Sequence, residues 1–267
     1  MKNRWMVSSL LSGAIALLIL GGYARPQKAE AVNVNARPEQ NNWDEEKHQN
    51  YQLAAGAHID VFNISGPVSV EATDGSTAEV SIYRRARNRD DLAYRKVSVD
   101  QTSRGLTITQ KNDGTERSAI DLLNRVVLKV PRQVSVSGRS ISGDFNVSGV
   151  SGAIDLNGIS GSVAVRHFNG ALTVSGVSGN VRVPVARIND AGLRVSGVSG
   201  NVYLGLASDL NAELSVGNTT AGVSNKIQGL ALVQVSSGPS NYSARLGSGG
   251  PRIEVSNVTG FIVLQRI

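Results

Sequence analysis

Glycine recurs every nine residues through the middle of the chain, at Gly143, Gly152, Gly161, Gly170 and Gly179. Each of these glycines lies in a block in which apolar and polar residues alternate, as in SGDFNVSGV, SGAIDLNGI and NGALTVSGV. A period this short leaves room for one strand and one turn. The repeat therefore predicts an all-β, single-domain β-solenoid, similar to a parallel β-helix, in which each short strand pairs with the copies above and below it.

Pairs of apolar residues in successive blocks predict the interior of this solenoid. Side chains two residues apart on a strand point to the same face. The interior pairs would be Phe145/Val147, Ile154/Leu156, Val163/Val165, Leu172/Val174, Val181/Val183, Leu193/Val195 and Val202/Leu204. The residues expected on the outer surface are Asn146, Asp155, Ala164, Thr173, Arg182, Arg194 and Tyr203. A coil of two blocks would contain about 18 residues and rise about 4.8 Å.

The repeating glycines are expected at sharp turns, where the backbone angle φ is often positive. That conformation costs a residue with a Cβ atom about 1 kcal/mol or more. We therefore expect Gly152→Val to reduce the stability of the fold.

Alternating segments predict further strands outside the repeat. Those before it lie at 59–61, 68–70, 78–83, 97–101, 105–110 and 126–130. Residues 111–124 are expected to form a polar loop with a short helical turn at 119–123. Those after it lie at 212–216, 230–235, 243–246, 253–255 and 261–264, and we expect them to add coils that end in a terminal strand.

The N-terminal segment has the pattern of an export signal. Lys2 and Arg4 precede an apolar stretch, and Ala29-Glu30-Ala31 matches a small-residue cleavage site. We expect residues 1–31 to be a cleaved signal peptide. The alternative is that residues 5–23 remain as a membrane anchor, since about 19 mostly apolar residues nearly span a bilayer.

Both alternatives export the remainder of the chain to the periplasm or the cell surface. Residues 32–52 are polar and lack apolar periodicity, which predicts a flexible linker. Residues 53–267 then form the single β domain.

Cysteine content and charge exclude several kinds of protein. The chain has no cysteine, so it has neither disulfides nor a thiolate metal site. The formal charge of +6 falls to +3 when residues 1–31 are left out, because that segment holds four basic residues and one acid. So small an excess of positive charge gives no reason to expect nucleic-acid binding.

The repeat also lacks the residues that catalysis or metal binding would require. Calcium-binding nonapeptides carry an aspartate in every repeat, whereas the matching blocks here offer only Asp144 and Asp155. The outer residues contain no recurring pair of carboxylates for sugar hydrolysis. If Asp155 meets Arg182 or Arg194, we expect only a surface ion pair. The three histidines have no ligand spacing. We therefore assign no catalytic, cofactor-binding or metal-binding residue.

One cluster of charge stands out before the repeat, and we name it the N-terminal basic cluster. It consists of Arg84, Arg85, Arg87, Arg89, Arg95 and Lys96. We expect it in an exposed loop, where it could contact anionic envelope polymers or lipid head groups. The alternative is a solvated loop that its own Asp90 and Asp91 partly neutralise.

Several stretches together carry a family resemblance. They are HIDVFNISGPVSVEATDG, VVLKVP, LTVSGVSGNVRV, LRVSGVSGNVYL and ARLGSGGPRIEVSNVTGFIVL. Over residues 53–267 the chain resembles the bacterial family of exported adhesin-like β-repeat proteins known as the DUF4097 type. The resemblance implies a solenoid-like fold, a place in the bacterial envelope and no established catalysis.

These observations predict a non-enzymatic envelope protein, an adhesin or scaffold that binds a surface polymer or a protein partner without a cofactor. Two alternatives remain open: a carbohydrate-active enzyme on a β-helix, and an accessory protein in envelope-stress signalling. The sequence names neither the ligand nor the oligomeric state.

Overall fold

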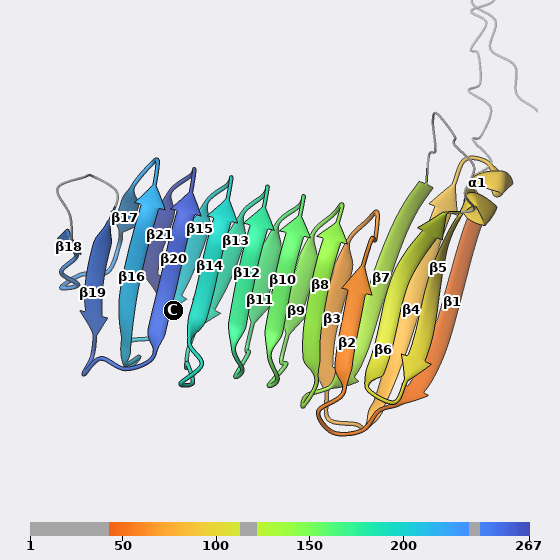
Figure 1. Cartoon of the computed structure of the whole chain (residues 1–267), viewed down its shortest axis with the longest axis horizontal. Coiled ribbons are helices and arrows are strands. Elements are labelled where there is room, and N and C mark those ends of the chain that lie inside the picture. Colours follow the sequence, from red (N-terminus) through yellow and green to blue (C-terminus); the bar gives the residue numbers. More distant parts are fainter. Residues whose placement is uncertain (1–42, 113–121, 235–240) are drawn as a thin grey trace, which may run out of the picture. The chain divides into compact units, whose positions relative to one another are not determined.

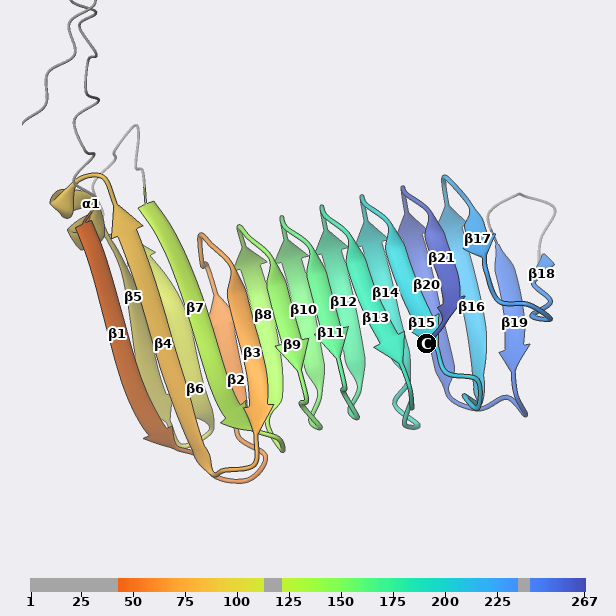
Figure 2. The same ribbon diagram turned by 180° about the vertical axis from the view of Figure 1, so that it is seen from behind.

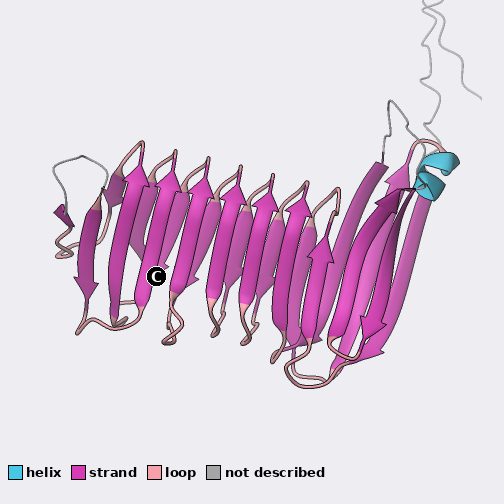
Figure 3. Cartoon of the chain, in the orientation of Figure 1, coloured by secondary structure: helices cyan, strands magenta, loops and turns pink. Residues whose placement is uncertain are grey.

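A computed structural model describes residues 43–112, 122–234 and 241–267 of the chain (Figure 1). The predicted signal or anchor at 1–31 lies outside these residues. The described residues form 21 strands and one short helix, α1 (Arg89–Tyr94), which Figure 3 shows in cyan. The all-β class is thus confirmed. The strands belong to two large mixed sheets that lie face to face (Figures 1 and 2).

The first sheet, sheet A, has ten strands. In spatial order they are β1 (Trp43–Gln52), β4 (Thr77–Ala86), β7 (Leu122–Pro131), β3 (Val68–Thr73), β9 (Phe145–Ser148), β11 (Val163–Arg166), β13 (Val181–Val185), β15 (Val202–Leu206), β21 (Ile262–Arg266) and β17 (Val223–Asn225).

The second sheet, sheet B, has eleven strands. In spatial order they are β18 (Val233–Gln234), β19 (Tyr242–Leu246), β16 (Ala212–Thr219), β20 (Arg252–Val258), β14 (Leu193–Val198), β12 (Leu172–Val177), β10 (Ile154–Ile159), β8 (Ser135–Ile141), β2 (His58–Phe62), β6 (Gly105–Asn112) and β5 (Arg95–Thr102).

Consecutive strands of the glycine repeat alternate between the two sheets. On sheet B, Ile154 lies opposite Val136 on one side and Leu172 on the other, and all three strands are parallel. On sheet A, Val163 lies opposite Phe145 in the same way. From β8 to β13 each strand therefore pairs with the strand 18 residues away, and two nine-residue blocks complete one passage through both sheets. The next two pairs, β12 with β14 and β13 with β15, are 21 residues apart because a longer loop intervenes.

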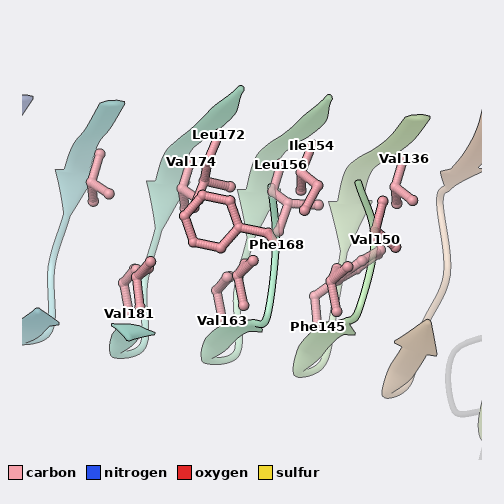
Figure 4. Close-up of a cluster of buried hydrophobic side chains, with 14 of the residues drawn as sticks. Val136, Phe145, Val150, Ile154, Leu156, Val163, Phe168, Leu172, Val174 and Val181 are labelled. Atoms are coloured by element: carbon pink, nitrogen blue, oxygen red, sulfur yellow. The ribbon is translucent and has the colours of Figure 1, made fainter. Parts of the chain in front are cut away.

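The inner faces of the two sheets enclose an apolar core (Figure 4). All the apolar pairs predicted from the repeat are buried. The exposed fractions of Phe145, Leu156 and Val174 are 0%. Gly138 makes room for the ring of Phe145, because a Cβ atom at Gly138 would lie 2.7 Å from that ring. The alternation of apolar and polar residues thus correctly predicts which side chains face inward.

The nine-residue glycines differ from the prediction in their physical role. None of the five has a positive φ. They are instead required by close packing between successive strands: a Cβ atom at Gly170 would lie 2.0 Å from the carbonyl oxygen of Gly152, and one at Gly152 would lie 2.2 Å from that of Val134. Space, rather than backbone conformation, excludes a side chain at these positions.

Positive φ occurs at a different position of the repeat, near the end of the parallel sheet B strands β2, β8, β10, β12, β14, β16 and β20. Gly158, Gly176 and Gly197 have φ values of 67°, 63° and 62°. The same place on neighbouring strands is occupied by Asn63, Ser140, Asn218 and Asn257, also with positive φ. Asparagine tolerates this left-handed conformation better than most residues with a side chain.

Three predictions about the ends of the domain were wrong. The expected linker at 32–52 contains strand β1, which pairs along its whole length with β4. Residues 122–123, placed in a helical turn, begin strand β7, and the remainder of that turn lies outside the described residues. Each strand was also expected to pair with equivalent strands of the repeat. At the two ends of the sheets, β1, β5 and β19 instead form antiparallel pairs with β4, β6 and β16.

The last strands of the chain do not form the end of the stack. Strand β20 lies between β14 and β16, and β21 lies between β15 and β17 (Figure 1). The apolar residues of β20 match those of the repeat, since Ile253 and Val255 lie opposite Leu193 and Val195. In both sheets, a strand from the C-terminal segment therefore lies between strands that precede it in sequence.

Candidate functional site

The N-terminal basic cluster lies at the end of the stack formed by β1, β4, β5 and helix α1. Arg84 and Arg85 are adjacent on strand β4 and therefore point to opposite faces. Arg84 faces inward and is buried, whereas the side chain of Arg85 is 58% exposed. The prediction that all six residues occupy one exposed loop is wrong: Arg84 is buried, and every member except Arg87 lies on β4, α1 or β5.

Arg84 holds three parts of this end together. Its guanidinium lies 2.5 Å from a carboxylate oxygen of Glu45 on β1, and it donates hydrogen bonds to the main-chain oxygens of Leu92 in α1 and Arg95 in β5. A buried arginine needs partners that compensate its lost hydration. These contacts make Arg84 a structural residue, which is not available to bind a ligand at the surface.

Burial and charge act in opposite directions on Glu45. Burial alone would raise the pKa of this carboxyl, but a hydrogen bond from Lys47 and the charges of Arg84 and Lys47 outweigh that effect and lower the pKa. Glu45 is therefore ionised across the neutral pH range and keeps its ion pair with Arg84.

Arg85 is paired on the outer surface. It donates two hydrogen bonds to Asp44, at 2.6 and 3.0 Å. The hydrogen bond from Arg85 holds the pKa of Asp44 below its ordinary value. Such an exposed pair contributes little to stability, and it partly neutralises Arg85.

The remaining four members of the cluster lie on or beside helix α1. Arg87, Arg89 and Lys96 are exposed, whereas Arg95 is half-buried and lies 3.4 Å from the hydroxyl of Ser65. Arg89 and Lys96, with Arg84, line a depression of about 630 Å³ between α1 and β1. Lys47, which the sequence analysis did not single out, adds another positive charge to its lining.

Acidic residues also line this depression, namely Asp44, Glu45 and Asp90. Two of them are engaged by Arg84 and Arg85. The cluster thus combines fixed structural ion pairs with exposed positive charge on the rim. Lys47 could have been predicted only if residues 43–52 had been recognised as a strand.

A second depression, of about 590 Å³, lies beside the first and shares Asp44, Glu45 and Arg84 with it. Its lining includes Tyr83 and Leu123, which are 39% and 67% exposed. Large apolar side chains at the surface are common individually.

The outer residues of the repeat divide between the two sheets. Asp155 lies on sheet B, so the predicted ion pair with Arg182 on sheet A is ruled out. Arg194 is separated from Asp155 by Thr173 and pairs instead with Glu254, at 3.1 Å. Asp155 therefore has neither of the partners considered for it.

The three histidines lie apart from one another, each in different surroundings. His48 contacts Ser81 and Glu46, His58 lies 3.4 Å from Asp60, and His167 is in a turn with φ of 50°. Over residues 43–112, 122–234 and 241–267, no three acidic, histidine or cysteine side chains gather as a metal site would require. Over the same ranges, no helix is long and apolar enough to cross a membrane.

Comparison with known proteins gives similar structures but no family. A putative cell adhesion protein from Clostridium sporogenes is 10% identical, with 84% of this chain and 100% of that chain aligned and a TM-score of 0.48. A putative adhesin from Bacteroides fragilis is 13% identical over 82% of this chain and 97% of that chain, with a TM-score of 0.31. A putative lipid binding protein from Parabacteroides distasonis is 13% identical over 82% and 96%, with a TM-score of 0.35.

No family model and no curated protein matches the chain. The resemblance to the DUF4097 type is therefore not confirmed. Similarities at these identities and scores do not establish a shared function.

Proposed function

We propose that this chain is an exported, non-enzymatic envelope protein whose parallel strands wind as a two-sheeted β-solenoid and whose outer surface binds an anionic polymer. The observation that carries the proposal is the register of the outer residues. On both sheets, side chains at equivalent positions repeat along the stack at the strand spacing of about 4.8 Å. Such a surface suits an extended ligand, which makes many small contacts.

The first contact point is the exposed part of the N-terminal basic cluster. Arg89 on α1 and Lys96 at the start of β5 line the 630 Å³ depression, and the exposed Arg87 lies in the bend just before α1. Exposed basic residues attract polyanions over about a Debye length of 8 Å at physiological salt. Arg84 and Arg85 support this site through their ion pairs with β1.

The test uses a variant in which Arg87, Arg89 and Lys96 are replaced by serine. We expect its retention on polygalacturonate to fall at least fivefold at 50 mM salt, because electrostatic contacts to a polyanion weaken together as charges are removed. The control variant replaces Arg187, Lys226 and Arg252, which are exposed in the other half of the chain and carry the same charge. Equal retention of both variants and the wild type would contradict the proposed contact.

The same incubation tests the absence of catalysis. We expect no new reducing ends and no unsaturated products from pectic or other acidic polysaccharides. Turnover that Asp155→Asn abolishes would instead establish a carbohydrate-active enzyme and overturn the proposal.

A further inference from the structure

Two arginines on the outer face of sheet A differ from the other arginines of the repeat. Arg166 on β11 and Arg182 on β13 are both exposed, and neither forms an ion pair in the part of the chain that the structure describes. On sheet B, three arginines have carboxylate partners, Arg139 with Asp60 at 3.3 Å, Arg194 with Glu254 at 3.1 Å and Arg245 with Glu213 at 2.9 Å, whereas Arg252 forms no ion pair with a described residue. Arg166 and Arg182 are therefore two uncompensated positive charges on adjacent strands of one face.

A depression lies between these two arginines and the neighbouring strand β9. Its volume is about 190 Å³, and Arg166, Arg182, Asn146 and Asn180 belong to its lining. The depression exists because Ala164, which lies in register between Asn146 and Arg182, has a short side chain. Ala164 and Ser162 thus lie between longer side chains on both sides.

The arginines are well placed to act together. They are on adjacent parallel strands and two residues apart in register, so their Cα atoms are separated by about 8 Å. The guanidinium of Arg182 also lies 5.1 Å from the ring centre of Tyr203 on β15. Stacking on an aromatic ring limits the motion of the guanidinium and leaves its edge free to donate hydrogen bonds.

One aspartate and two asparagines also line the depression. Asp144 lines it, with one carboxylate oxygen accepting the main-chain N–H of Ser162 at 2.7 Å. Asn146 adds an amide group that can both donate and accept hydrogen bonds. Asn180 adds an amide N–H₂ donor, while its side-chain oxygen accepts the main-chain N–H of Asn201 at 2.8 Å. The depression therefore offers polar groups for sugar hydroxyls as well as guanidinium donors for an anion.

We propose that this depression binds one negatively charged sugar unit of an acidic polysaccharide. The anionic group lies against Arg166 and Arg182, and the sugar hydroxyls face Asp144 and the two asparagines. This inference rests on the proposed function and gives it a second, more specific site. The small volume fits a single unit of a longer polymer lying across the sheet, since complete small-molecule pockets usually exceed about 300 Å³.

Three variants test the site. Arg166→Ser/Arg182→Ser removes the guanidiniums. Ala164→Met fills the depression without changing charge, and it points outward, so the core is left intact. Arg139→Ser/Arg194→Ser is the control, because it removes the same charge from sheet B. Each variant is compared with the full-length wild type by calorimetry at 50 and 200 mM salt.

The probes are polygalacturonate, which carries carboxylates, dextran sulfate, which carries sulfates, and neutral dextran. We expect the wild type to bind at least one charged polymer and not the neutral one. Arg166→Ser/Arg182→Ser and Ala164→Met should each weaken that binding at least tenfold, and the sheet B control less than twofold. The charged polymer that binds more tightly identifies the anionic group.

The possible failures are distinguishable. If the wild type binds neither charged polymer, the proposed function and this site are both overturned. If binding is lost only when Arg87, Arg89 and Lys96 are replaced, the function stands and this site is overturned. Unchanged binding by Ala164→Met also overturns it, even where the arginine variant binds more weakly, because charge alone would then account for the effect.

Discussion

At the scale of single residues, glycine has two separate physical roles in this fold. At Gly170 there is no space for a side chain, because the next strand's main chain lies where a Cβ atom would be. At Gly158 a Cβ atom would meet its nearest neighbour at an ordinary 3.5 Å, and the requirement is a positive φ of 67°. The two positions should therefore respond differently to substitution.

We predict that Gly170→Ala destabilises the protein by about 1–3 kcal/mol, the usual cost of forcing atoms into a packed site. Gly158→Asn should cost about 1 kcal/mol or less, because asparagine already occupies the equivalent place at Asn63, Asn218 and Asn257. Urea unfolding of both variants measures the difference. Equal destabilisation, or a larger loss at Gly158, would contradict the assignment of steric exclusion to the nine-residue glycines.

The ion pair between Arg84 and Glu45 predicts a loss of stability in acid. Because the pKa of Glu45 is lower in the folded protein than in the unfolded chain, the unfolded chain takes up a proton first as the pH falls. The pair's contribution is present above about pH 4.3 and is lost as the pH falls through the folded-state pKa. Glu45→Gln should cost about 2 kcal/mol at pH 7, since it leaves a buried arginine without its charged partner.

Unfolding of the wild type and Glu45→Gln at several pH values between 3 and 7 tests this account. The difference in unfolding free energy should shrink as the pH falls through the acidic range. A constant difference would show that the charge of Glu45 does not matter to the folded state.

At the scale of elements, strand β1 covers the end of sheet A. Its outer residues are polar and charged, which discourages further strands from adding to the exposed edge. Its inner face holds Glu45, Lys47 and Gln49, opposite Arg84, Ile82 and Val80 of β4. Strand β1 thus serves as a polar end strand that closes an apolar core.

A chain that begins at residue 53 should therefore be less stable than one that begins at residue 43. The expected loss is about 3 kcal/mol, because Val80 and Ile82 lose part of their cover, and full burial of such a side chain is worth about 1.5–3 kcal/mol. Light scattering should also show self-association through the newly exposed edge of β4. Equal melting of the two chains would mean that β1 is only a linker, as the sequence alone suggested.

The elements that were predicted correctly and those that were not differ in the distance over which their contacts form. The repeat strands can be recognised from the local alternation of apolar and polar residues, so Ile154, Leu172 and their equivalents were correctly predicted to face the core. Strand β1 has no apolar alternation, and its partners on β4 lie 25 to 43 residues away in the chain. The burial of Arg84 likewise depends on Glu45, and no local pattern indicates it.

The candidate sites show the same limit. The basic residues of the N-terminal cluster were visible in the sequence, but their division into buried and exposed members follows from the direction of β4. Arg166 and Arg182 lie in different blocks of the repeat, and only a coil of 18 residues brings them to adjacent strands of one face. A sequence motif could not separate them from Arg194, which lies on the other sheet.

At the scale of the whole domain, from Gln40 to Ile267, each coil contacts mainly its neighbours, so stability should vary along the stack. Central strands such as β11 and β13 are paired on both sides. We predict the slowest amide hydrogen exchange there and the fastest in β17 and β18, which are short and lie at the far end of each sheet. Uniform protection along the chain would indicate a single cooperative unit instead.

In the central repeat, strands 18 residues apart are neighbours, whereas strands nine residues apart lie on opposite sheets. Because the chain contains no cysteine, introduced pairs can be tested without background. In Asp155→Cys/Thr173→Cys the two positions are in register on adjacent strands, so their Cα atoms are about 5 Å apart, within reach of a disulfide.

In Asp155→Cys/Ala164→Cys the positions are nine residues apart and on the outer faces of different sheets, about 10 Å or more apart. Mild oxidation of the folded protein, read as a mobility shift under non-reducing denaturing conditions, should form the bond in the first variant and not in the second. Efficient cross-linking of the second variant with none in the first would contradict the two-sheet arrangement and, with it, the placement of both candidate sites.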